Sequence, residues 1–103
     1  MTARISIDRE ALEAFCRRWA IVEMSLFGSV LRDDFGPDSD VDVLVTFSDE
    51  AEWTLFHLVE MEEELALIFD RDVDLVVKKG IERSPNHLRR RAILNSAEPV
   101  YVA

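Results

Sequence analysis

The chain has 103 residues, of which 49% are hydrophobic, which is enough for one domain over residues 1–103 with a core that folds without disulfides. The single Cys16 excludes an intramolecular disulfide framework, and the N-terminal sequence lacks the basic region and long apolar run of a secreted or membrane-spanning protein, so we expect a cytoplasmic protein. A net charge of −9 disfavours non-specific binding to nucleic acid and favours a basic protein partner.

The first predicted element is a helix over residues 8–19, because apolar residues recur there at three- and four-residue spacing: Leu12, Phe15, Cys16 and Trp19. Either Ser6 or Asp8 is placed to cap its start. Cys16 lies on the apolar side of this helix, so we interpret it as a core residue and not as a reactive thiol.

A strand is predicted next, over residues 22–27, where apolar and polar side chains alternate. It stops at Gly28-Ser29, which indicates a tight turn into a short helix through about Asp34, followed by a loop over residues 35–38. A Gly-Ser corner between a strand and a helix can bind phosphate, because the first helical amides and the hydroxyl point outward as donors.

The second half predicts two strands and two helices. Strands are expected over residues 40–47 and 72–77, helices over 52–68 and 85–95, and an extended segment at the end: Val100, Tyr101 and Val102. Ser84 and Pro85 suit the cap and first position of the last helix. The clusters at residues 60–64 (glutamates) and 89–91 (arginines) are interpreted as solvated helix faces.

These elements predict an α/β fold whose helices pack mainly on one face of a sheet. Strand order does not follow from periodicity. The apolar face should consist of Val41, Val43, Val45, Val73, Leu75 and Val77. Aromatic residues are expected in the core or at a partner interface: Trp19, Trp53, Phe56 and Phe69. His57 and His87 are interpreted as surface or packing residues.

Paired carboxylates carry the chemistry that the sequence suggests. Asp40 and Asp42 lie two residues apart on a predicted strand, about 6.5 Å along it and on the same face. A later strand carries Asp72 and Asp74 in the same phase, so spacing alone leaves open which of them is a third ligand. Several carboxylates at one end of a sheet repel one another unless cations neutralise them, and all-oxygen ligation suits Mg²⁺.

In order along the chain, the segments 27–29 (Phe-Gly-Ser) and 39–45 (Ser-Asp-Val-Asp-Val-Leu-Val), with Arg32 between them, resemble the signature of the polymerase-β nucleotidyltransferase superfamily. More narrowly they are similar to its minimal nucleotidyltransferase (MNT) branch. The resemblance implies a small mixed sheet of at least three strands and a magnesium-dependent active site in residues 27–45 and 72–77.

By this resemblance, Gly28 and Ser29 would hold the nucleoside triphosphate, and Asp40 and Asp42 would bind two Mg²⁺ ions. The third metal-binding carboxylate, which activates the acceptor hydroxyl, precedes a Leu-Val pair in the family, which matches Asp74. Arg32 is expected on the nucleotide, although Asp33 stands where the usual Gly-Ser-x-x-Arg-Gly run has its last Gly.

The MNT branch further implies a function. Its members are antitoxins of helical HEPN-family RNase toxins, and transfer AMP from ATP to a tyrosine of the toxin. We therefore expect a protein adenylyltransferase with a HEPN partner in a hetero-oligomer. Two alternatives stay open: an antitoxin that neutralises the toxin by binding and occlusion alone, or nucleotidyl transfer to a small molecule.

Overall fold

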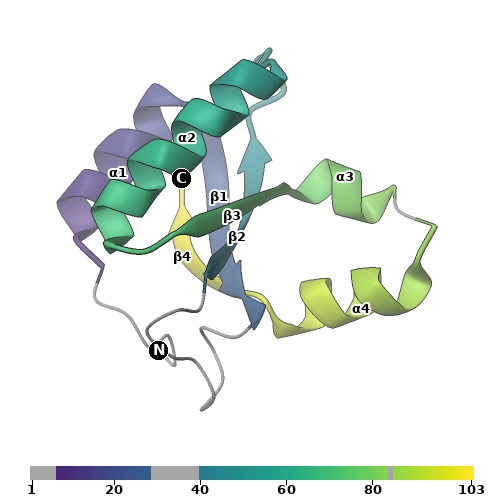
Figure 1. Ribbon diagram of the computed structural model, residues 1–103. Coiled ribbons are helices and arrows are strands. Elements are labelled where there is room, and N and C mark those ends of the chain that lie inside the picture. Colours follow the sequence, from purple (N-terminus) through teal and green to yellow (C-terminus); the bar gives the residue numbers. More distant parts are fainter. Residues whose placement is uncertain (1–6, 29–39, 84) are drawn as a thin grey trace.

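The computed structural model describes residues 7–28, 40–83 and 85–103, which form a four-stranded sheet with helices on both faces (Figure 1). The strands lie in the order β3-β2-β1-β4. In chain order the elements are α1 (Arg9–Arg18), β1 (Ile21–Phe27), β2 (Val41–Phe47), α2 (Leu55–Phe69), β3 (Val73–Val77), α3 (Lys78–Glu82), α4 (His87–Ser96) and β4 (Glu98–Val102).

The sheet is mixed, as expected. β1 pairs antiparallel with both β2 and β4, whereas β2 pairs parallel with β3 across the connection through α2. A parallel pair needs such a long crossover, because the chain must return to the same end of the sheet before the second strand begins. The C-terminal segment that the sequence predicted only as extended is the edge strand β4.

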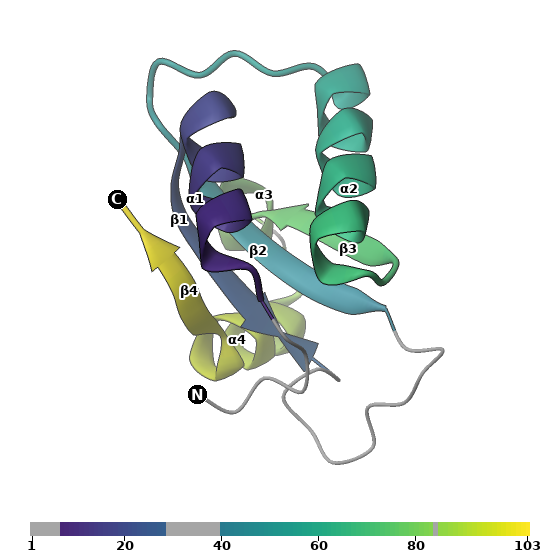
Figure 2. The ribbon, with the colours of Figure 1, turned by 90° about the vertical axis from the view of Figure 1, so that its left-hand side faces the viewer.

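The larger core lies between the sheet and the two helices α1 and α2, which cover the same face (Figure 2). Val41, Val43 and Val45 are each 0% exposed, which confirms that the alternating valines point inward. The corresponding residues of the edge strand β3 are partly buried and pack against this core: Val73, Leu75 and Val77.

A smaller apolar cluster covers part of the opposite face. It is built from Phe27 of β1, Leu44 of β2, Ile81 of α3 and Ile93 of α4. Leu44 lies on the face where the sequence suggested polar side chains, because α3 and α4 cover that face and exclude water from it. The sequence predicted helices mainly on one face; α1 and α2 lie on one face, whereas α3 and α4 lie on the other.

The helix starts follow the capping side chains. Asp8 accepts a hydrogen bond from the Ala11 amide and caps α1. The alternative cap, Ser6, lies outside the described residues. The predicted start of the last helix at Ser84-Pro85 is wrong. Asn86 caps α4 instead, by accepting a hydrogen bond from the Arg89 amide at 3.1 Å. The short helix and the loop predicted within residues 29–38 lie outside the described residues.

The aromatic residues divide between core and surface. Trp19 and Phe69 are buried, and Trp53 packs edge-on against Trp19 with 5.1 Å between ring centroids. His57 packs beside Trp53 and accepts a hydrogen bond from the Thr54 amide at the start of α2, which agrees with its interpretation as a packing residue. Phe56 is 81% exposed and so is not a core residue. No helix among the described residues is long and apolar enough to cross a membrane.

Candidate active site

The ends of three neighbouring strands meet at one end of the sheet. β1 ends at Phe27, and β2 begins beside it because the two strands are antiparallel. β3 begins at the same end of the sheet because it runs parallel to β2. The register places Phe27 opposite Asp42, and Asp42 opposite Asp74, in one row across three strands. Residues paired in this way project from the same face of a sheet.

Asp42 and Asp74 therefore lie side by side on neighbouring strands, whose backbones are about 4.8 Å apart. Both line a cavity of about 310 Å³ on the face opposite the valine core. Two carboxylates this close repel each other, and a cation between them removes that repulsion. Their oxygen atoms are the donors that Mg²⁺ prefers.

Asp40 and Asp72 lie just outside this row. Asp40 is exposed and precedes β2, whereas the Asp72 carbonyl accepts a hydrogen bond of 2.8 Å from the Val41 amide. Neither residue lines the cavity. Within residues 7–28, 40–83 and 85–103, no three side chains of the metal-binding types His, Cys, Asp and Glu form a ready metal site. The structure thus brings together Asp42 and Asp74, and leaves Asp40 exposed just before β2.

Gly28 is held in place by two features of the local structure. Its φ angle is +75°, in the left-handed region that residues with a Cβ atom rarely adopt. A Cβ atom built on Gly28 would lie 2.3 Å from Oδ2 of Asp42. The space that a side chain would need is therefore occupied by the carboxylate, and glycine lets the strand end approach Asp42 closely.

Two predicted nucleotide-binding residues, Ser29 and Arg32, lie outside the described residues. Gly28, directly before Ser29, lines the cavity together with the two aspartates.

The structure adds one residue that sequence reasoning missed. Arg89 of α4 lines the cavity together with Asp42 and Asp74, although the sequence analysis assigned it to a solvated helix face. Ala92, Ile93 and Ser96 of the same helix complete that wall. The cluster of three arginines was visible in the sequence, but helical spacing alone does not say which of them faces the strands β2 and β3.

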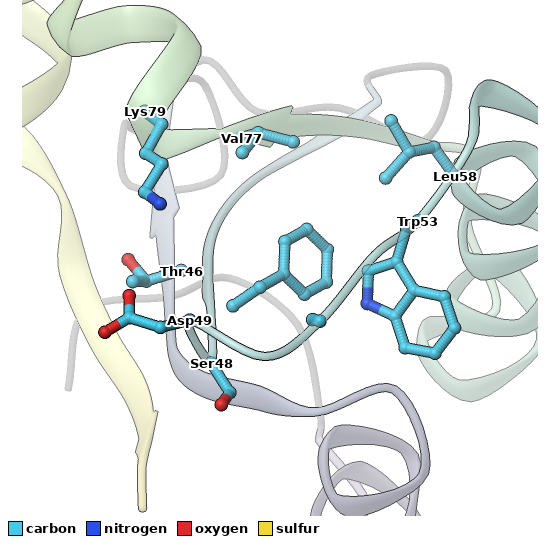
Figure 3. Close-up of a pocket in the computed structure, with 9 residues that line it drawn as sticks. Thr46, Ser48, Asp49, Trp53, Leu58, Val77 and Lys79 are labelled. Carbon is cyan, nitrogen blue, oxygen red and sulfur yellow. The ribbon is translucent and has the colours of Figure 1, made fainter.

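A second cavity, of about 200 Å³, lies at the other ends of β2 and β3 (Figure 3). Phe47 and Trp53 provide apolar walls, and Lys79 and Asp49 contribute polar groups. Phe47 is five residues along β2 from Asp42, which corresponds to about 16 Å. This cavity is therefore separate from the aspartate pair, and none of the predicted site residues that the structure describes lines it.

Comparison with known proteins places these features in a family. The model of the nucleotidyltransferase domain family matches residues 8–100. Protein adenylyltransferase MntA of Thermococcus cleftensis is 37% identical over 65 residues, which are 63% of this chain and 64% of that protein. The matched part thus spans less than two thirds of this curated relative.

Solved structures give the same fold. One provisionally described as a minimal nucleotidyltransferase is 33% identical, with a TM-score of 0.68 over 89% of this chain and 88% of that one. A second, of the tri-AMPylated HEPN toxin of Shewanella oneidensis in complex with its MNT antitoxin, has a TM-score of 0.61 at 22% identity, over 92% of this chain and 70% of that one. With its family model matched from residue 8 to residue 100, the chain belongs to the nucleotidyltransferase domain family, and within it resembles the minimal nucleotidyltransferases.

Proposed function

We propose that this protein is a Mg²⁺-dependent protein adenylyltransferase, and that it transfers AMP from ATP to a tyrosine of a HEPN-family toxin in the cytoplasm. The observation that carries the proposal is the row formed by Asp42 and Asp74 beside the tight corner at Gly28. The name of the Thermococcus relative and the AMPylated toxin in the Shewanella complex support the choice of reaction and acceptor. The single domain over residues 1–103 would act together with this partner.

In this reaction the tyrosine oxygen attacks the α-phosphorus of ATP, and the bond from that phosphorus to pyrophosphate breaks. Asp42, Asp74 and Asp40 would hold the metal ions, which would neutralise negative charge on the triphosphate and the leaving pyrophosphate. Asp74 would also accept the proton of the tyrosine hydroxyl. Gly28 and Ser29 would orient the phosphates through the amides of the corner, with Arg32 beside them.

Apolar side chains that α2 exposes near both of its ends support a protein partner. Leu55, Phe56 and Leu67 are 75%, 81% and 84% exposed. Glu60 and Glu63 lie between them along the same helix. Apolar side chains flanked by acidic ones suit a partner surface whose apolar residues are surrounded by basic ones.

The test is intact mass spectrometry of the HEPN-family product of the neighbouring gene after incubation with this protein, Mg²⁺ and ATP. We expect a gain of one or more AMP units, which Asp42→Ala abolishes because it removes one of the two paired carboxylates. Asp49→Ala is the matched control, because Asp49 is exposed at the other end of β2. It should transfer AMP as the wild type does.

The outcome also distinguishes the binding-only alternative. An unmodified toxin that is nevertheless neutralised in a stable complex, by the wild type and by Asp42→Ala alike, would reject enzymatic transfer in favour of occlusion. Transfer to a small-molecule hydroxyl, with the toxin left unmodified, would reject the proposed acceptor but keep the chemistry.

A further inference from the structure

One side of α4 forms a wall of the aspartate cavity. Arg89, Ala92, Ile93 and Ser96 follow at helical spacing and line the cavity opposite the strand ends. Ile93 is 7% exposed and packs into the smaller core with Phe27. This anchor fixes which side of α4 faces the aspartates, and Arg89 lies one turn before it.

Arg89 is the cationic residue among the described residues that line this cavity, whose other charged groups are the carboxylates of Asp42 and Asp74. Ser96 does not compete with it as a donor, because the Ser96 hydroxyl donates a hydrogen bond of 2.6 Å to the Ala92 carbonyl within the helix. A guanidinium group presents a planar set of N–H donors that matches phosphate oxygens and stays charged at any working pH.

The two neighbouring arginines have different surroundings. Arg90 donates to the Glu82 carbonyl at 3.3 Å and contacts Nδ1 of His87 at 2.8 Å, so it connects α4 to the end of α3 and to its own first turn. Arg91 is exposed and does not line the cavity. The same helix therefore carries Arg89, which lines the cavity, and Arg91, which does not and can serve as its control.

We propose that Arg89 binds the polyphosphate chain of the nucleotide, and so makes the site prefer a nucleoside triphosphate to a monophosphate. This inference rests on the proposed function, because it assumes that a nucleotide occupies the cavity. The chain carries a net negative charge that repels phosphates, so a cation that lines the same cavity as the two carboxylates provides local attraction for the triphosphate. The α4 wall is thereby part of the nucleotide site, in addition to the Gly28 corner.

The test is calorimetric binding of α,β-methylene-ATP, whose α–β bridge cannot be cleaved, and of AMP, each with Mg²⁺. The variants are Arg89→Gln, Arg89→Lys and the matched control Arg91→Gln. We expect Arg89→Gln to weaken binding of the ATP analogue about tenfold and of AMP less than about twofold, because the hydrogen bonds lost are those to the β- and γ-phosphates, which AMP lacks. Arg89→Lys should fall between wild type and Arg89→Gln, and Arg91→Gln should match wild type.

Circular dichroism melting of each variant checks that the fold is retained, which the exposure of Arg89 leads us to expect. Equal affinity of Arg89→Gln and wild type for the ATP analogue overturns the inference, as does an equal loss for the analogue and AMP. If wild type binds the analogue but modifies no partner, the proposed function fails while the Arg89 inference stands. If wild type binds neither nucleotide, both fail.

Discussion

Replacing Gly28 by alanine tests the geometry of the candidate site most directly. The added Cβ atom would lie 2.3 Å from Asp42 Oδ2, whereas ordinary contact begins at 3.4 Å, so the carboxylate would have to move by about 1 Å. The backbone would also have to keep a φ angle of +75° with a Cβ atom present, which costs about 1–2 kcal/mol.

Together with about 1 kcal/mol for forcing Asp42 from its rotamer, Gly28→Ala should lower the free energy of unfolding by about 2–3 kcal/mol. For a domain of this size that lowers Tm by about 10–20 °C in a thermal melt. Binding of a Mg²⁺-bound ATP analogue should be lost at temperatures well below the new Tm, because Asp42 no longer lies beside Asp74.

Gly80→Ala is the matched control, because a Cβ atom at this position of α3 meets nothing within 4 Å. It should raise stability by about 0.5–1 kcal/mol, as expected for replacing glycine in a helix.

A double-mutant cycle identifies the cause. In an Asp42→Ala background the clashing oxygen is absent, so Gly28→Ala should cost about 1 kcal/mol less than in the wild type. An equal cost in both backgrounds would refute the steric argument, and an unchanged Tm for Gly28→Ala alone would refute the assigned backbone conformation.

Two further predictions concern stability. Glu62 Oε2 accepts a hydrogen bond of 2.9 Å from the Leu75 amide on the open edge of β3, so Glu62→Ala should cost about 1–2 kcal/mol in urea unfolding. The exposed Glu63→Ala should cost less, and equal costs would contradict the role of this bond. Burial raises the pKa of Cys16 from 9.0 to about 12, with Glu13 adding to the effect, so the native thiol should resist alkylation at pH 8. Because the unfolded thiol ionises first, stability should fall as the pH rises from 9.0 to about 12, and Cys16→Ala should remove that part of the slope in urea unfolding at the two ends of this range.

Local patterns in the sequence were sufficient for the parts of the fold that depend on near neighbours. The period-two alternation of Val41, Val43 and Val45 determines which side chains share a face, so the buried face of β2 followed directly from the sequence. The Gly28 corner was visible for the same reason, because a glycine at the end of an alternating run marks a turn. Helix starts were harder to predict, since Ser84 and Asn86 are both residues that favour the cap position, and only the structure shows that Asn86 caps α4.

Only the tertiary structure decided which distant residues meet. Asp72 and Asp74 alternate in phase, and the parallel register of β3 against β2 is what places Asp74 beside Asp42. A shift of this register by two residues would keep every side chain of β3 on the same face, so the alternation within the strand does not distinguish Asp74 from Asp72. In the same way, burial of Ile93 against Phe27 turns α4 so that Arg89 faces the aspartates. The sequence thus determined which chemical groups are present and on which faces of their own elements they lie, whereas long-range packing brought those groups into one cavity.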